Sequence, residues 1–67
     1  MPFSADRVRK YRESRDMSRE ALAESIGRSY PSVVLYETGR VTPPLSVIED
    51  IAQALNVTTA DLLDEAA

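Results

Sequence analysis

A chain of 67 residues is long enough for one small domain, which we expect to span residues 1–67 and to bury about 60% of its unfolded surface. The sequence contains neither cysteine nor histidine, so disulfides, thiolate metal sites and imidazole chemistry are excluded. No apolar run approaches the roughly 20 residues that cross a bilayer, and no signal peptide opens the chain. We therefore expect a soluble, cytoplasmic protein.

The net charge of −3 conceals an asymmetry along the chain. All eight basic residues lie in the first 40 positions together with six acidic ones, so this part carries +2. The remaining 27 residues carry five acidic residues and no basic one. This division favours a molecule that turns one face toward a polyanion. The alternative is a small acidic protein whose charges are simply scattered.

The first expected helix begins after a cap at Ser4 and runs to about Arg15, with Asp16 in the left-handed conformation that ends it. Helical spacing brings four side chains to its core-facing side: Val8, Tyr11, Arg12 and Arg15. Two arginines therefore stand where apolar residues are expected. Their stems can cover the core while their charged ends find partners.

The stretch from about residue 18 to residue 38 predicts two short helices that meet at Gly27. Each helix has one apolar stripe, made by Leu22, Ala23 and Ile26 in the first and by Val33 and Tyr36 in the second. Ser18 and Ser29 stand where each helix needs an N-cap. Gly27 supplies the left-handed residue of a tight turn. Together these features predict a helix-turn-helix.

The C-terminal part predicts two further helices. Gly39 ends the preceding helix, and Pro43 and Pro44 keep the connector extended. The next stripe comprises Leu45, Ile48, Ile51, Ala52 and Leu55, and Asn56 is an acceptable left-handed stop. Capping-box spacing over residues 58–61 predicts a last short helix that closes over the core. The expected fold is an all-α domain of five helices.

The spacing of the helix-turn-helix resembles one known family. A polar Arg19 is followed by Ala23, Gly27, Val33, Tyr36 and then Glu37-Thr38-Gly39, a pattern similar to the phage repressor and Cro class, or XRE type. Residues 8–12 resemble the first helix of that class, and residues 43–57 and 58–63 resemble its fourth and fifth. The resemblance implies a transcriptional regulator that binds double-stranded DNA as a dimer and needs no cofactor.

A DNA-binding role divides the candidate residues into two groups. Phosphate contacts are expected from Ser18 and Arg19 at a helix N-terminus, and from Arg28 and Arg40 on either side of the third helix. Base-edge contacts are expected near the start of the third helix, from Ser29, Tyr30, Pro31 and Ser32, and one turn later from Leu35. As alternatives, Arg19 is a helix-face charge and Tyr30 is a lid on the core.

The third helix departs from the family in its base-reading positions. No Gln, Asn, Arg or Lys lies between Tyr30 and Thr38, so the bidentate readers of guanine and adenine are missing. Readout would then rest on thymine-methyl contacts, hydroxyls and DNA shape. Pro31, Val34 and Leu35 also form an outward apolar patch, which can mark a protein interface. The competing function is therefore an antitoxin-like or adaptor module that binds a protein partner.

Two further expectations concern packing and assembly. Arg12 should form a mostly buried ion pair with Glu37, because a buried arginine requires a partner; the family resemblance implies the same pair. A weak homodimer is expected through residues 41–67, where Val47 and Val57 are apolar but not obviously used by the helix stripe.

Enzymatic and metal-binding functions find little support in the residues. The sequence has no phosphate-binding glycine loop and no thiol or imidazole, so we expect neither catalysis nor a metal site. The acidic residues Asp61, Asp64 and Glu65 raise the alternative of a cation site. A solvated acidic face near a helix start explains them better.

Overall fold

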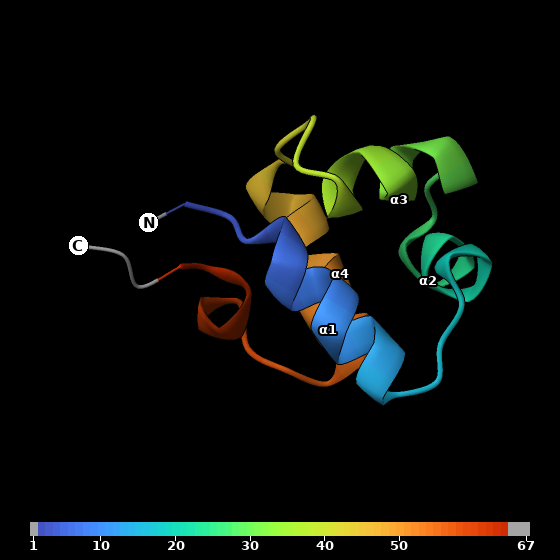
Figure 1. The fold of residues 1–67 in the computed structure, drawn as a ribbon, viewed down its shortest axis with the longest axis horizontal. Helices are drawn as coiled ribbons and strands as arrows, with labels where there is room; N and C mark the ends of the chain where they lie inside the picture. The colour runs from blue at the N-terminus through green and yellow to red at the C-terminus, as the bar shows by residue number, and fades with distance from the viewer. Residues whose placement is uncertain (1, 65–67) are drawn as a thin grey trace.

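The computed structural model describes residues 2–64, and in this part the fold is helical, as the sequence predicts (Figure 1). Four α-helices follow one another: α1 (Ala5–Ser14), α2 (Arg19–Ile26), α3 (Tyr30–Glu37) and α4 (Leu45–Leu55). A single 3₁₀ turn, η1 (Ala60–Leu62), comes last. None of the described helices has the length and apolar character to cross a membrane.

The prediction of a fifth α-helix is wrong, because the chain makes only the turn η1 there. The capping box does form: Thr58 N donates to Asp61 Oδ2 at 2.9 Å, and Asp61 N donates to Thr58 Oγ1 at 3.2 Å. Leu63 then becomes extended and pairs in an isolated β-bridge with Phe3. This pairing with the N-terminal segment competes with continuation of the helix, while Leu62 is fully buried in the core.

Serine side chains begin the first three helices, as the sequence predicts. Ser4 accepts from Arg7 N at 3.2 Å, Ser18 from Ala21 N at 3.0 Å and Ser29 from Ser32 N at 3.3 Å. The predicted left-handed residues follow four helices and have positive φ: Asp16 (53°), Gly27 (69°), Gly39 (76°) and Asn56 (57°). Local capping chemistry therefore determines where each of these helices begins or ends.

One apolar core joins all the elements. It comprises Val8 of α1, Leu22, Ala23 and Ile26 of α2, Val33 and Tyr36 of α3, Val47, Ile48, Ile51, Ala52 and Leu55 of α4, and Leu62 of η1. The helix α4 contacts α1, α2 and η1, and α2 also packs on α3. The helix α1 packs on α3 and α4 packs on α2, so both support the helix-turn-helix.

Two expectations about α4 are wrong. Val47 is buried with 1% of its surface exposed, whereas Leu45 is 67% exposed. At about 100° per residue, Leu45 lies roughly 90° from the centre of the face formed by Val47, Ile48, Ile51, Ala52 and Leu55. Val47 is consequently used by the core and is not free for a dimer contact. Val57 is half-buried against the same core.

The two arginines at the end of α1 behave differently from one another. Arg12 is buried, as the sequence predicts, but Arg15 is exposed and its guanidinium lies 5.3 Å from the ring centre of Tyr11. Arg15 is the C-cap residue of α1, so it no longer follows the core-facing direction of the helix. The expectation that Arg15 covers the core is therefore wrong.

Candidate nucleic-acid interface

The helices α2 and α3 meet in a tight turn that leaves the start of α3 exposed. Arg28 N donates to Ala23 O at 3.0 Å, and Gly27 N donates to Glu24 O at 3.3 Å, so the carbonyls at the end of α2 are capped. Along α3, Val33, Tyr36 and Glu37 point into the molecule. The opposite side of this helix is exposed.

The exposed side of α3 carries the predicted base-contact residues. Tyr30 is 42% exposed and Leu35 is 39% exposed, and Pro31 is exposed between them. Ser32 is only half-buried, and its hydroxyl lies 2.9 Å from the hydroxyl of Ser29. The Ser29 hydroxyl also caps α3 by accepting from Ser32 N, so neither hydroxyl is a wholly independent group for base recognition.

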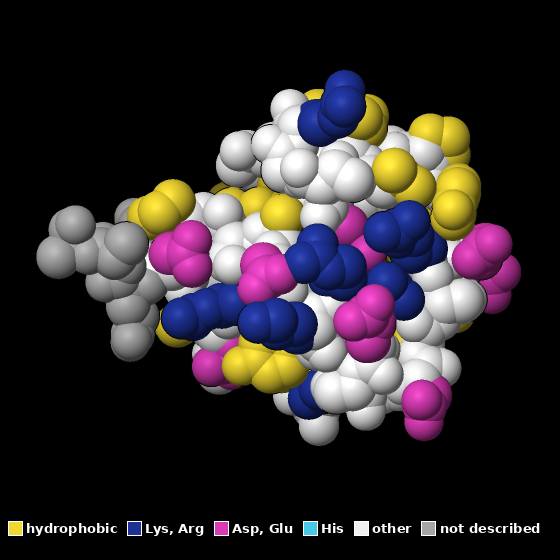
Figure 2. Space-filling view, viewed as in Figure 1, with side chains coloured by type: hydrophobic (Ala, Val, Ile, Leu, Met, Phe, Trp, Pro, Cys, Tyr) yellow, Lys and Arg dark blue, Asp and Glu magenta, His cyan; other side chains and the backbone are white. Residues whose placement is uncertain are grey.

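Positive charge surrounds this apolar side of α3. Figure 2 shows Lys and Arg side chains gathered over α1 and toward α3, with apolar side chains over the start of α3. The side chains of Arg28 and Arg40 are exposed before and after α3, respectively. Ser18 is exposed at the start of α2 and Arg19 follows it with one third of its side chain exposed. The predicted phosphate contacts therefore lie on elements next to α3.

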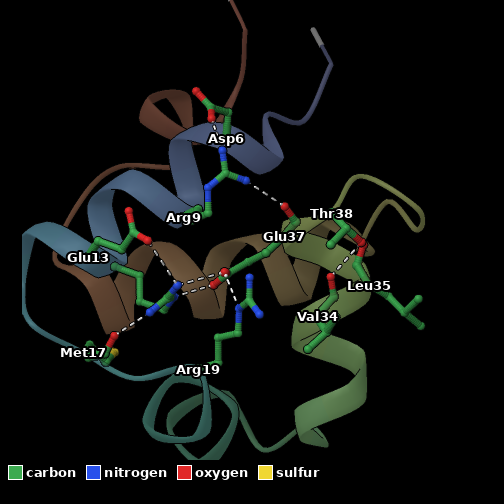
Figure 3. A network of polar contacts seen from close by, with 10 residues as sticks. Asp6, Arg9, Glu13, Met17, Arg19, Val34, Leu35, Glu37 and Thr38 are labelled. Atoms are coloured by element: carbon green, nitrogen blue, oxygen red, sulfur yellow. Dashed lines mark hydrogen bonds and ion pairs between the residues drawn. The ribbon is translucent and has the colours of Figure 1, made fainter.

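The carboxylate of Glu37 is the centre of a polar network that joins three helices (Figure 3). This side chain is completely buried. From α1, Arg12 donates through Nε at 2.6 Å and through Nη2 at 3.1 Å. Arg12 also donates through Nη1 to Met17 O at 2.7 Å. The structure thus brings Arg12 and Glu37 together in the two-pronged geometry that suits a guanidinium and a carboxylate.

Arg19 joins the same carboxylate from α2, which the sequence analysis missed. Its Nε donates to Glu37 Oε1 at 3.0 Å. This hydrogen bond raises the pKa of Arg19, and the neighbouring Tyr30 raises it further. The two residues Arg19 and Glu37 are 18 positions apart, so only the packing of α2 against α3 reveals the contact.

Arg9 is a second contact that the sequence analysis missed. Its Nη1 donates to the backbone carbonyl of Glu37 at 3.2 Å, while its Nη2 pairs with Asp6. The available signal was its position three residues before Arg12, which places both side chains on one side of α1. Arg9 therefore ties α1 to the last turn of α3.

The acidic residues near the C-terminus are already engaged in local contacts. Asp61 bonds with Thr58, and the pKa of Asp61 is lowered first by the backbone hydrogen bond from Thr58 and then by its side chain. Asp64 lies 3.8 Å from Arg7 Nε. Glu65 lies outside the described residues. Within residues 2–64, no cluster of three acidic ligands has a geometry that could hold a metal ion.

These features define a helix-turn-helix domain, and comparison with known proteins agrees. A family model described as a helix-turn-helix domain matches residues 5–66. The chain therefore belongs to the helix-turn-helix family. The resemblance to phage repressors is confirmed by a relative from Vibrio cholerae, the cryptic phage CTXphi transcriptional repressor RstR, which is 30% identical over 61 residues. The match covers 91% of this chain and 55% of the repressor, so the chain spans about half the length of that relative.

Solved structures show the same fold in regulators. The restriction-modification controller protein C.AhdI from Aeromonas hydrophila matches with a TM-score of 0.85 and 29% identity, over 88% of this chain and 89% of C.AhdI. The master regulator for biofilm formation SinR, solved in complex with DNA, matches with a TM-score of 0.83 and 28% identity. That match covers 90% of this chain and 97% of the SinR chain.

The fold also occurs as part of an enzyme. Hydroxypropylphosphonic acid epoxidase from S. wedmorenis matches with a TM-score of 0.86 and 26% identity. The match covers 94% of this chain but only 34% of the epoxidase. About two thirds of that enzyme therefore has no counterpart in this chain.

Proposed function

We propose that this protein is a DNA-binding transcriptional regulator that inserts α3 into the major groove. The observation that carries the proposal is an exposed α3 start, formed by Tyr30, Pro31 and Leu35, with arginines on the neighbouring elements. The relatedness to the repressor RstR and to SinR, a regulator solved with DNA, supports the same function. We propose no catalytic role for this protein.

The phosphate contacts in this proposal come from both sides of α3. The first amides of α2, next to Ser18, favour an anion because they have no partner within the helix. Arg19 adds a positive charge at the same end of α2. Arg28 and Arg40 supply exposed positive charges before and after α3. Such contacts position the protein on the duplex and make its affinity depend on salt.

Base contacts are few and mostly apolar in this proposal. Pro31 and Leu35 suit thymine methyl groups, and the Tyr30 hydroxyl can exchange a hydrogen bond with a base edge. The hydroxyls of Ser29 and Ser32 contribute less, since they bond to one another. We therefore propose modest sequence specificity, with a share of recognition through DNA shape.

Assembly on DNA as a weak homodimer is part of the same proposal. Two protomers that each read one half-site gain affinity without new base readers. Within residues 41–67, the exposed apolar side chains Val41 (42% exposed) and Leu45 (67% exposed) replace Val47 as the residues that a dimer contact would cover.

A protein-interaction module is the second candidate, and the apolar exposed side of α3 favours it. Pro31 and Leu35 are exposed on that side, Val34 is half-buried, and none of the three is charged. In an antitoxin-like or adaptor protein this side would bind a partner protein, and the surrounding arginines would form the rim of the interface.

A titration of random-sequence duplex DNA at several salt concentrations separates the two candidates. If roughly three to five phosphates are neutralised per protomer, log K falls against log salt with a slope of about −3 to −5. Fluorescence anisotropy with a labelled duplex measures this slope. Absence of salt-sensitive binding at micromolar protein would favour the protein-interaction module over the regulator.

A further inference from the structure

Glu37 is placed to orient a DNA-contacting arginine, in addition to pairing with Arg12. Its Oε1 accepts from Arg12 Nη2 at 3.1 Å and from Arg19 Nε at 3.0 Å, and its Oε2 accepts from Arg12 Nε at 2.6 Å. The carboxylate is completely buried, whereas Arg19 has one third of its side chain exposed. Arg19 thus connects the interior of the protein with the surface beside α3.

Because Glu37 binds Arg19 through Nε, the outer end of the Arg19 guanidinium remains available for a further contact. Glu37 accepts from the Nε atom, and the contacts drawn in Figure 3 involve neither Nη atom of Arg19. A guanidinium held through Nε can still present an Nη pair to one phosphate, with donors in a rigid plane. Tyr30, from the start of α3, is a further neighbour that raises the pKa of Arg19.

In this network Glu37 can orient Arg19 without neutralising the positive charge of Arg19. Arg12 is only 8% exposed and gives two hydrogen bonds to Glu37, so these two residues already form a neutral pair. Arg19 adds a positive charge to this pair and is partly exposed, while the exposed carboxylate of Glu13 lies 3.9 Å from Arg12 Nη2. On α1, Arg9 and Asp6 pair with each other beside the network.

We propose that Glu37 is a positioning residue for DNA binding: through the Arg19 Nε contact it holds the Arg19 Nη atoms toward a backbone phosphate. This inference rests on the proposed DNA-binding function. It makes one buried carboxylate on α3 responsible for placing a phosphate contact on α2. The contact thereby fixes the position of the phosphate-binding side chain, Arg19, relative to the side chains of α3 that enter the groove.

A double-mutant cycle tests the coupling between Glu37 and Arg19. In wild-type protein, Glu37→Gln should weaken binding to a labelled duplex about tenfold, because Arg19 loses its charged acceptor. In an Arg19→Ala background the same change should weaken binding less than about twofold. Anisotropy is measured at a temperature where circular dichroism shows every variant folded. Equal losses in both backgrounds would overturn the proposal.

A charge-preserving pair of variants gives a second test that does not alter the buried carboxylate. Arg19→Lys keeps the charge but removes the Nε donor, so DNA binding should fall about fivefold to tenfold. Arg15→Lys makes the same change at an exposed position outside the interface and should leave binding within about twofold. Equal binding by Arg19→Lys and the wild-type protein would contradict the positioning role.

Nuclear magnetic resonance of the wild-type protein decides the case if Glu37→Gln does not fold. The Nε–H signal of Arg19 should exchange slowly with solvent and be ordered, and the exposed Arg28 should show a mobile, fast-exchanging signal. Equal mobility of the two would overturn the positioning role while DNA binding still stands. Absence of any salt-sensitive binding by the wild-type protein would overturn both this inference and the proposed function.

Discussion

At the scale of single residues, Glu37 is predicted to contribute strongly to stability. Replacing it with alanine strands the buried guanidinium of Arg12 and removes the acceptor of Arg19. Breaking a buried pair in this way costs about 3–5 kcal/mol, so we expect Glu37→Ala to lower the free energy of unfolding by that amount. Urea denaturation followed by circular dichroism measures the loss.

An exposed ion pair provides the control for that substitution. Asp6 pairs with Lys10 at 3.1 Å, and both side chains are more than half exposed. Because solvent screens such pairs, Lys10→Ala should leave the urea midpoint almost unchanged. If Glu37→Ala costs less than about 0.5 kcal/mol, the level of a surface substitution, the pair with Arg12 contributes nothing through its burial.

A prediction about a single residue succeeds when the sequence pattern of its own helix shows which way its side chain points. Arg12 stands on the core-facing side of α1, so a buried partner is required, and the structure places Glu37 there. The contact between Arg19 and Glu37 depends instead on the way α2 packs against α3. Leu45 and Val47 show the same limit, since a rotation of roughly 90° decides which of them is buried.

At the scale of elements, the turn between α2 and α3 depends on one glycine. Gly27 has φ of +69°, and a Cβ added to it would meet no atom within 4 Å. Gly27→Ala should therefore cost only the backbone strain, about 1–2 kcal/mol in the free energy of unfolding. Gly27→Asn should cost less, because Asn tolerates the left-handed conformation. Thermal denaturation compares the two; equal losses would show a packing role that the open space around Gly27 argues against.

The element η1 should make stability depend on acid pH. Hydrogen bonds from Thr58 hold the pKa of Asp61 below its ordinary value, so the charged form is favoured in the folded state. This stabilisation is complete above the unfolded pKa, near 4, and is lost as pH falls through the lower folded pKa. Asp61→Asn should lower the melting temperature at pH 7, and the difference from wild type should shrink in that acid range.

The same substitution at Asp50, an exposed residue of α4, is the control for Asp61→Asn. It should change the melting temperature little at either pH. If the difference in melting temperature between Asp61→Asn and the wild-type protein stays constant down to pH 2, the charge of Asp61 does not have this role.

The boundaries of the first three helices were predictable because their caps act locally. The length of the last element, η1, was not predictable. Serine caps and left-handed residues act within four positions of the chain, so the ends of α1, α2 and α3 follow closely from sequence. The length of η1 is decided by the pairing of Leu63 with Phe3, which lies 60 residues away in the chain. No local pattern contains that contact.

At the scale of the whole molecule, weak self-association is the expected state in solution. The exposed side chain of Leu45 lies at the start of α4, four positions after the exposed Val41 in the preceding connector. Leu45→Glu should abolish dimerisation while the domain stays folded, since Leu45 is outside the core. Analytical ultracentrifugation at increasing protein concentration measures this. A strict monomer at millimolar concentration, with one protein per duplex, would contradict the dimer.

The candidate interface was predictable in outline, because its residues lie within one continuous helix-turn-helix stretch. Exposure of Pro31 and Leu35 follows from the apolar stripe that turns Val33 and Tyr36 inward. The mutual hydrogen bond of Ser29 and Ser32 and the tie of Arg19 to Glu37 required the packed structure. Charge therefore identifies the side of the molecule that we propose as the DNA-binding side, and packing decides which polar groups remain available there.

The central claim, that this surface binds DNA mainly through its phosphates, is tested most directly by two substitutions on one preferred and one random duplex. The preferred sequence is first selected from a random pool. Arg28→Ala should weaken binding about equally on both duplexes and reduce the salt slope by about one. Leu35→Ala should leave the slope unchanged and narrow the difference in affinity between the duplexes. If neither substitution alters DNA binding, this surface belongs to a protein partner and the account is wrong.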